Sequence, residues 1–510
     1  MGMENIEHVV VVMFENRSFD NLLGWLYDAA NPPGFNIPPN PNGPPTFDGL
    51  VLGKYSNQYS PQPGAVKTVA LTKGTQAWPP SCPNSNQVPT PDPNEEFDYV
   101  TNQLFGTKTP SAGASPDMSG FLEDYATADG VKAPEQIMGT YTPDQAAVIN
   151  QIAKSFAVCD RWFAPVPSQT WPNRGFMHSG CSDGHLNNDD SEPYDIPTIF
   201  NVLADQGKSW GVFHDTTIIP SLTWIQFSPQ LTLLESHFHK YSAFQQLCQA
   251  QADAQPAQKL PSYSFIEPRF APELRPFSIE VDFPSDYHPP HNICRGEQFL
   301  ADVYQCVRTS PYRDKILLII TFDEHGGCFD HVPPPSGAAS PNPGAVSREL
   351  LPDKTPKFKF DRFGIRVPAI VVSSYVEPGT VFRANPNESP YDHTSILATI
   401  RDWPALGLNK TKFLPSGRIA AAPTLDRVLT RAVGQEPPDW PDIEATCTIN
   451  GTADAPLDTP ISDLQANLLA SAKADLTDTS LQDAVTQVNA VNTYADALNF
   501  LQPQPPPAAP

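Results

Sequence analysis

Residues 316–327 read ILLIITFDEHGG, and this stretch decides the fold. The apolar run from Ile316 to Ile320 has the length and the β-branched content of a fully buried strand. Asp323 and Glu324 follow the strand, and two glycines come soon after. Ligands of a parallel α/β sheet bind at the carboxyl ends of its strands. We therefore expect both carboxylates at that edge, where a divalent cation would offset their repulsion; the alternative is a solvated acidic turn.

A second stretch of the same kind opens the chain. Residues 6–14 are apolar, and the polar sequence ENRSFD follows at 15–20. Glu15 and Asn16 both offer oxygen atoms that suit a hard cation. The alternative is the start of a helix, with Asn16 or Ser18 as its N-cap.

A third polar cluster, SQTWPNR, occupies residues 168–174. Thr170 lies between two prolines that stiffen the backbone, and Arg174 can bind two phosphate oxygens at once. A hydroxyl that is held rigidly at an anion-binding turn is a candidate nucleophile. Ser168 is the rival within the cluster, and a purely structural turn is the alternative for both.

Short apolar strands alternate with helical patterns along most of the chain. Residues 235–247, which include His237 and His239, fit a helix, and residues 260–268 and 367–373 fit buried strands. This alternation predicts a doubly wound, mostly parallel α/β domain over residues 1–435. Residues 31–118 are rich in proline and predict an excursion of loops that forms a lid near the site. Residues 436–510 predict a C-terminal helical appendage and a disordered Pro-rich tail.

Composition limits the classes of partner. The 510-residue chain has a formal net charge of −24, which argues against nucleic acid and anionic membrane surfaces as bulk electrostatic partners. It has no run of 18 apolar residues, so we expect no transmembrane segment, although transient contact with a membrane surface stays open. No signal peptide is expected in this chain, which leaves a cytoplasmic protein or one exported with a leader outside this sequence. The eight cysteines form no C-x-x-C pair, and their disulfide state stays open.

Four motifs in order carry a family resemblance. They are ENRSFD at 15–20, T-x-P-N-R at 170–174, D-x-H-P at 286–289, and D-E-x-G-G-x-x-D-H-V-x-x-P at 323–335. Over residues 4–435 the chain resembles the phosphoesterase family of bacterial phospholipases C, plant non-specific phospholipases C and AcpA-type acid phosphatases. The resemblance implies an alkaline-phosphatase-like fold.

The resemblance also implies roles for individual residues. Thr170 matches the Ser/Thr nucleophile, and His288 matches a phosphate-binding histidine, with His239 and His393 as two further substrate-binding histidines. The implied metal ligands are Glu15, Asn16, Thr170, Asp323 and Glu324. This oxygen-rich set favours one divalent ion of Ca, Mg or Mn.

The sequence departs from the family in one place. Some relatives carry an active-site histidine upstream of the nucleophile, whereas this chain has no histidine between His8 and His178. We expect that a phosphate contact is missing here or is replaced by a residue of the lid.

Three functions compete at this stage. The first is a metal-dependent phospholipase C that acts on glycerophospholipids through a phosphothreonine intermediate, with apolar residues of 19–59 around its cleft. The second is a broad acid phosphatase that acts on phosphomonoesters. The third is a non-catalytic binding protein whose Pro-rich regions serve as partner ligands.

Overall fold

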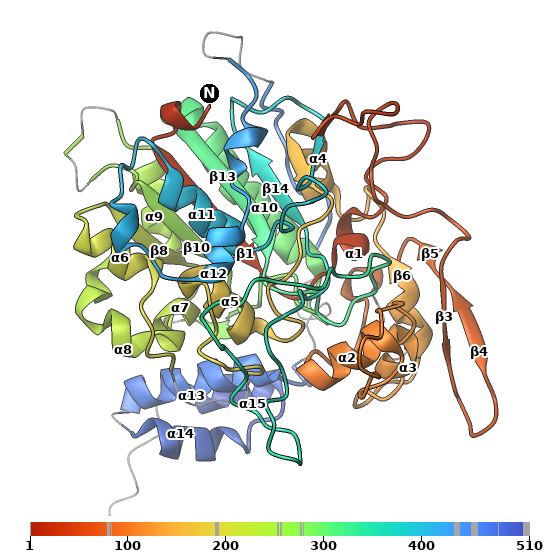
Figure 1. The fold of residues 1–510 in the computed structure, drawn as a ribbon. Helices are drawn as coiled ribbons and strands as arrows, with labels where there is room; N and C mark the ends of the chain where they lie inside the picture. The colour runs from red at the N-terminus through yellow and green to blue at the C-terminus, as the bar shows by residue number, and fades with distance from the viewer. Residues whose placement is uncertain are drawn as a thin grey trace, which may run out of the picture.

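A nine-stranded sheet forms the centre of the protein, in the order β2-β15-β7-β14-β13-β1-β10-β8-β9. Its strands β14, β13, β1, β10 and β8 are labelled in Figure 1. The computed structural model describes residues 2–78, 82, 84–188, 193–251, 254–255, 258–275, 278, 280–432, 439–449, 457–477 and 479–502. Six of the eight strand pairings are parallel, and β14 runs antiparallel to both of its neighbours. The strands are β1 (His8–Phe14), β2 (Phe35–Ile37), β7 (Ala157–Cys159), β8 (Trp210–His214), β9 (Phe238–Lys240), β10 (Tyr263–Glu267), β13 (Ile316–Phe322), β14 (Ala369–Val372) and β15 (Thr380–Phe382).

Every residue of β1 and β13 is buried, so both faces of this sheet are covered. One group of helices in mutual contact contains α4, α9 and α10, and another contains α5, α6, α11 and α12 with α8. The larger helices are α4 (Ala147–Ser155), α5 (Thr170–Ser179), α6 (Ile199–Asp205), α9 (Tyr241–Cys248), α10 (Ile293–Arg308) and α11 (Thr394–Asp402). The shorter ones are α1 (Phe19–Leu23), α3 (Phe121–Tyr125), α7 (Leu222–Gln226), α8 (Ser228–Leu231) and α12 (Gly417–Ala421). The predicted α/β class with a mostly parallel sheet is confirmed.

The Pro-rich excursion at 31–118 contains more regular structure than the loops that its composition predicts. Its strand β2 adds to the edge of the central sheet, and β3 (Ser56–Tyr59) and β4 (Lys67–Ala70) form a hairpin. Its helix α2 (Phe97–Phe105) buries Phe97, Val100 and Leu104. These three residues have helical spacing, which the surrounding prolines and glycines obscure. The remaining short strands are β5 (Thr72–Lys73), β6 (Gly139–Thr140), β11 (Glu273–Leu274) and β12 (Val281–Asp282).

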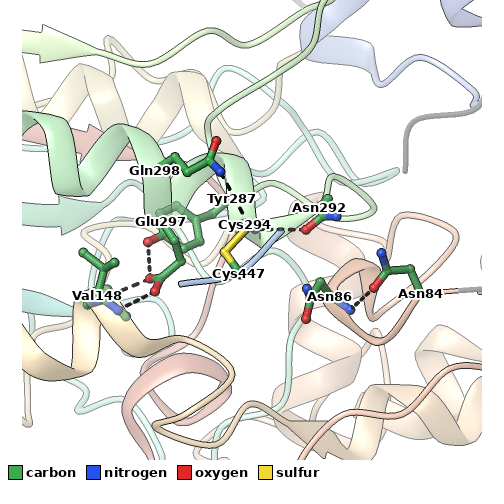
Figure 2. Close-up of a disulfide and its surroundings, with 10 residues drawn as sticks. Asn84, Asn86, Val148, Tyr287, Asn292, Cys294, Glu297, Gln298 and Cys447 are labelled. Atoms are coloured by element: carbon green, nitrogen blue, oxygen red, sulfur yellow. Dashed lines mark hydrogen bonds between the residues drawn. A yellow bond between two sulfur atoms is a disulfide. The ribbon is translucent and has the colours of Figure 1, made fainter. Parts of the chain in front are cut away.

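Three C-terminal helices lie along one end of the molecule in Figure 1: α13 (Asp463–Thr477), α14 (Leu481–Val488) and α15 (Tyr494–Phe500). Leu464, Leu468 and Leu469 of α13 belong to the same hydrophobic core as the central sheet. A disulfide between Cys294 of α10 and Cys447 also ties the segment before these helices to the body (Figure 2). The predicted disordered tail, 503–510, lies outside the described residues. None of the described helices is long and apolar enough to cross a bilayer.

One local prediction was wrong. His239 lies on strand β9 and not on a helix, because Phe238–Lys240 pairs with β8 as the outermost strand of the sheet. Helix α5 starts at Thr170, within the third polar cluster. Proline is tolerated in the first turn of a helix, so Pro172 does not prevent this early start.

A buried ionic network fixes the turn at Asp330 and His331. Arg366 lies 2.9 Å from both Asp20 Oδ1 and Asp330 Oδ1, and His331 Nδ1 lies 2.6 Å from Asp20 Oδ2. Asp20, Asp330 and His331 could in principle hold a metal ion, but the Arg366 guanidinium already supplies positive charge there. Burial opposes the charged imidazole, but the hydrogen bond that His331 donates to Asp20 and the negative charge of Asp20 outweigh burial and raise the pKa of His331 to about 9. We therefore interpret this cluster as structural.

Replacement of this histidine tests the interpretation. His331→Ala should lower the free energy of unfolding by about 2–4 kcal/mol, because it removes one of the two charged partners of the buried Asp20 and leaves only Arg366. Since the folded pKa lies above the ordinary value of 6.5, the stabilisation is full below pH 6.5 and disappears as the pH rises through about 9. Denaturant titrations should show that wild-type stability falls over this interval, by at most about 3 kcal/mol more than that of the variant. A variant with unchanged stability but no catalysis would contradict the structural role.

Candidate active site

The ends of two neighbouring parallel strands bring Glu15 and Asp323 together. Phe14 pairs with Phe322 in the β1–β13 register, so the next residue of each strand is Glu15 or Asp323. Asp323 Oδ1 accepts hydrogen bonds from the backbone N–H of Asn16 (3.1 Å) and of Glu324 (2.7 Å). All four residues are fully buried. The carboxylate pair thus results from strand register, as the sequence predicts.

A close backbone approach shapes the turn that follows. Asn16 has φ +58°, a left-handed conformation that asparagine tolerates better than most residues. Gly326 has φ +60°, and a Cβ atom there would lie 2.1 Å from the Asn16 carbonyl oxygen. Only glycine fits at this position, which explains why a glycine follows the acidic pair.

Thr170 lies beside the carboxylates at the first position of helix α5. Its Oγ1 donates a 3.3 Å hydrogen bond to Glu15 Oε2, and the side chain is fully buried. Ser168 points elsewhere, since its Oγ donates to Leu186 O and contacts Asn187 Oδ1. Of the two hydroxyls in the cluster, only Thr170 hydrogen-bonds to the acidic group.

Arg174, one turn further along α5, forms ion pairs with both strand-end carboxylates. Its Nη2 lies 2.6 Å from Glu15 Oε1, and its Nε lies 3.3 Å from Asp323 Oδ2. Its Nη1 is buried and has no hydrogen-bond partner. Nη1 is therefore a donor that a phosphate oxygen could accept from.

His288 joins the site from a loop between β12 and α10. Its Nε2 accepts from Asn16 Nδ2 at 2.9 Å, and its Nδ1 lies 2.5 Å from the Pro289 carbonyl. Asp286 holds this loop in place: its Oδ1 accepts from His288 N (3.0 Å), and its carbonyl accepts from Glu15 N (2.9 Å). Burial lowers the pKa of His288 to about 4, so the imidazole is neutral.

The other two predicted histidines lie differently. Nε2 of His393 donates to the Asp323 carbonyl at 2.6 Å, and its Nδ1 accepts from Trp162 Nε1, so both ring nitrogens already have partners. His239 stacks on Phe213 at the edge of the sheet, where β8 and β10 separate its strand from β1. Of the three predicted histidines, His288 therefore contacts the cluster, His393 hydrogen-bonds to the backbone of Asp323, and His239 lies apart from both.

No pattern in the sequence indicated Glu95, which the Pro-rich excursion supplies. Glu95 is buried, its Oε1 lies 3.6 Å from His288 Nε2, and its carboxylate faces that of Glu324. Asp92 of the same segment lies 3.6 Å from His288 Nδ1. The only available hint was the missing upstream histidine, which suggested that a lid residue replaces it.

Negative charge accumulates in this buried cluster. Burial, followed by repulsion from Asp323, raises the pKa values of Glu15 and Glu324 well above their usual range. Burial and the neighbouring Glu324 do the same to Glu95. Arg174 is the one arginine or lysine among the described residues that forms an ion pair with this group. Buried carboxylates at this density require further positive charge or protons.

The donor set fits a hard divalent cation. Asn16 Oδ1 and Glu324 Oε1 are buried and accept no hydrogen bond, although each is a good acceptor. Together with Glu15 and Asp323 they form an all-oxygen set of the kind that Ca²⁺, Mg²⁺ and Mn²⁺ prefer. The Thr170 hydroxyl, on Glu15, completes the five predicted ligands.

A cavity of about 600 Å³ opens next to the cluster. It shares Glu95 and His288 with the cluster and reaches Gln169, which precedes Thr170. No described residue of 19–59 lines it, so the apolar residues predicted from that segment do not belong to this cavity. Its lining comprises residues 87, 90–96, 129, 169, 188, 288–291 and 458–465.

Helix α13 contacts two segments that line this cavity. Gln465 Nε2 lies 3.3 Å from His291 Nε2, and His291 Nδ1 lies 2.6 Å from Asp286 Oδ1, the carboxylate that also holds His288. Asn467 Nδ2 donates to the Asn188 carbonyl, and Asn188 Oδ1 accepts from the N–H of Trp171, next to Thr170. The C-terminal appendage thus contacts the segments that carry the nucleophile candidate and the histidine.

Comparisons with known proteins agree with the resemblance seen in the motifs. The chain is 34% identical to non-specific phospholipase C6 of Arabidopsis thaliana over 409 residues, which cover 78% of this chain and 67% of the relative. It is 30% identical to non-specific phospholipase C4 of the same plant over 514 residues, 98% of this chain and 85% of the relative. Phospholipase C A of Mycobacterium tuberculosis is 26% identical over 424 residues, 78% and 73% of the two chains.

A solved structure titled as a protein in the alkaline phosphatase superfamily from Vibrio parahaemolyticus aligns over 56% of this chain and 65% of its own. Its sequence identity is 10% and its TM-score 0.29. A likeness of that size says nothing about individual residues. The model of the phosphoesterase family, in contrast, matches residues 6–405. The chain therefore belongs to the phosphoesterase family and is a hydrolase that acts on phosphoester bonds.

Proposed function

We propose that this enzyme is a phospholipase C that releases a phosphorylated head group from glycerophospholipids, with Thr170 as the nucleophile. The observation that carries the proposal is the buried Thr170 hydroxyl, which donates to Glu15 Oε2 within a group of carboxylates. The names of the plant and mycobacterial relatives support the lipid substrate.

The proposed reaction has two displacements. Thr170 Oγ1 forms a bond to phosphorus while Glu15 Oε2, its hydrogen-bond acceptor, can take the hydroxyl proton. The bond between phosphorus and the diacylglycerol oxygen breaks, and that oxygen takes up a proton. Water then attacks the phosphothreonine and restores the hydroxyl. Arg174 Nη1, which has no partner, can donate to a phosphoryl oxygen in both steps.

A divalent cation, when bound by Glu15, Asn16, Asp323 and Glu324, would offset phosphate charge and lower the hydroxyl pKa. Residues of the chain itself position the reacting groups. Asp286 holds His288 and the backbone of Glu15 in one arrangement, and His393 fixes the Asp323 carbonyl. These contacts position the reacting groups before substrate arrives.

One observation favours the second candidate, a phosphatase that acts on small monoesters. The cavity is lined largely by polar and charged residues and by prolines, so it would suit a small polar ester. Hydrolysis of p-nitrophenyl phosphate and of its phosphocholine diester, each with and without chelator, separates the candidates. The proposal expects faster turnover of the diester and loss of activity with chelator. A preference for the monoester would support the phosphatase, and no turnover of either would support a non-catalytic role.

The loop at 347–358 is a candidate for contact with a lipid surface. Leu350 and Leu351 lie at its tip, 56% and 43% exposed, next to the exposed Lys354. Residues 345–362 carry five lysines and arginines against three acidic residues, in a chain with a net charge of −24. The loop packs on the segment 184–188 through Arg348 N and Glu349 Oε1, and Asn188 of that segment lines the cavity. We propose that this tip touches the phospholipid surface.

Removal of the exposed leucines tests this contact. The double variant Leu350→Ser and Leu351→Ser should lose vesicle binding and turnover of vesicle lipid, because both depend on the apolar tip. Turnover of the soluble diester should stay unchanged, since the loop contributes no residue to the catalytic cluster. The matched control is Leu233→Ser, which replaces a leucine that is 96% exposed on another part of the surface. Equal vesicle binding by the double variant and the control would refute the contact.

A further inference from the structure

Two acids without an assigned role form a compact group with His288 beside the carboxylate cluster. Asp92, Glu95 and His288 each offer one ligand atom, and these atoms all lie within 4.8 Å of one another. The two acids come from the Pro-rich excursion, and the histidine comes from the loop before α10. All three line the cavity, so a small ion can reach them.

His288 has the arrangement of a metal-binding histidine. Its Nδ1 donates to the Pro289 carbonyl, so the lone pair of the ring lies on Nε2. Asn16 Nδ2 donates to Nε2 at 2.9 Å, and a bound cation would take the place of this donor. Nε2 faces Glu95 Oε1 at 3.6 Å. This separation is too long for a hydrogen bond, and it leaves room for an ion that contacts both atoms. An anchored neutral ring whose second nitrogen carries a lone pair is the form that coordinates a cation.

Glu324 supplies an independent observation. Its Oε1 is fully buried, accepts no hydrogen bond and belongs to a carboxylate that faces Glu95. No described lysine or arginine forms an ion pair with Asp92, Glu95 or Glu324. One divalent cation at the predicted position, together with Arg174, offers three positive charges to the five acids Glu15, Asp92, Glu95, Asp323 and Glu324.

The charge of the cavity lining also indicates a need for additional positive charge. A phosphoester is an anion, yet no lysine or arginine occurs among the described residues that line the cavity. The lining instead includes Asp92, Glu95, Glu96, Asp129, Asp458 and Asp463. Without additional positive charge, this wall would repel the substrate of a phosphoesterase.

We propose that Asp92, Glu95 and His288 bind a second divalent cation, distinct from the one predicted at Glu15, Asn16, Thr170, Asp323 and Glu324. Glu324 Oε1 would be shared between the two cations. The mixed nitrogen and oxygen donors suit Mn²⁺ or Zn²⁺ better than Ca²⁺. The Pro-rich excursion then does more than cover the site, because it supplies two of the ligands. Sites with two neighbouring metal ions are a recurrent way to hold a phosphoryl group.

Counting bound Mn²⁺ tests the proposal without reference to activity. Chelator-treated full-length protein is titrated with MnCl₂, and free Mn²⁺ is followed by electron paramagnetic resonance. The wild type should bind two equivalents, whereas Glu95→Gln and Asp92→Asn should each bind one. Asp323→Asn should also lose one equivalent but keep the other. The matched control is Asp129→Asn, which removes a cavity carboxylate outside the group and should bind two.

The outcomes separate this proposal from the proposed function. One equivalent in the wild type, or two in both Glu95→Gln and Asp92→Asn with unchanged circular dichroism, would overturn the second cation position. Two equivalents in the wild type and one in these variants would support it even if no phospholipid were hydrolysed. A phospholipase that binds one equivalent would keep the proposed function and lose this inference.

Discussion

Thr170→Ala should abolish hydrolysis of the phosphocholine diester, with a fall in kcat of at least about 10⁴-fold. The variant removes the attacking oxygen and only one 3.3 Å hydrogen bond, to Glu15 Oε2, so the fold should persist. Alanine is also well suited to the first turn of α5. Steady-state kinetics measures the loss, and circular dichroism with Mn²⁺ binding confirms that structure and cation uptake remain.

Two further variants sharpen this result. Thr170→Ser should retain appreciable activity, because the hydroxyl remains and only a methyl group is lost. Ser168→Ala is the control for the neighbouring hydroxyl: it should leave the chemical step intact and cost about 1 kcal/mol of stability, since Ser168 Oγ bonds to Leu186 O. Loss of catalysis in Ser168→Ala at unchanged stability would move the nucleophile away from Thr170.

Asp323→Asn should remove both activity and one bound cation. The carboxylate has three roles: it accepts from Asn16 N and Glu324 N, pairs with Arg174, and is a predicted cation ligand. Asparagine keeps the Oδ1 acceptor but loses the negative charge, so we expect a fall in kcat of at least about 10³-fold. Kinetics and Mn²⁺ titration of the same preparation give the two readouts.

The matched control is Asp361→Asn, which neutralises an exposed acid away from the cluster. It should change neither readout. If Asp323→Asn bound as much Mn²⁺ as the wild type, the predicted cation position at the strand ends would be wrong, whatever the effect on turnover.

The strand ends were predictable from the sequence for a physical reason. An apolar run that is buried on both faces must end where polar residues begin, and parallel neighbours end at the same edge. Glu15 and Asp323 therefore had to lie close together once residues 8–14 and 316–322 were recognised as strands. The antiparallel direction of β14 was not predictable, because strand direction leaves no mark on a short apolar run.

Other parts of the site depend on contacts that no local pattern encodes. Glu95 lies among prolines in a segment without periodicity, and only the packing of α2 brings it to Glu324. Arg174 was expected to bind phosphate oxygens, but in the structure it forms ion pairs with Glu15 and Asp323. His239 belongs to a short edge strand, whose three residues cannot be told from a helix turn by periodicity.

The stereochemical course at phosphorus tests the central claim, nucleophilic attack by Thr170, most directly. The substrate is a single diastereomer of the phosphorothioate analogue of the p-nitrophenyl phosphocholine diester, hydrolysed in ¹⁸O-labelled water. Two successive displacements, through Thr170 and then water, each invert the configuration, so the phosphorothioate product should show net retention. Direct attack by water would invert the configuration once, and an inverted product would contradict the phosphothreonine intermediate.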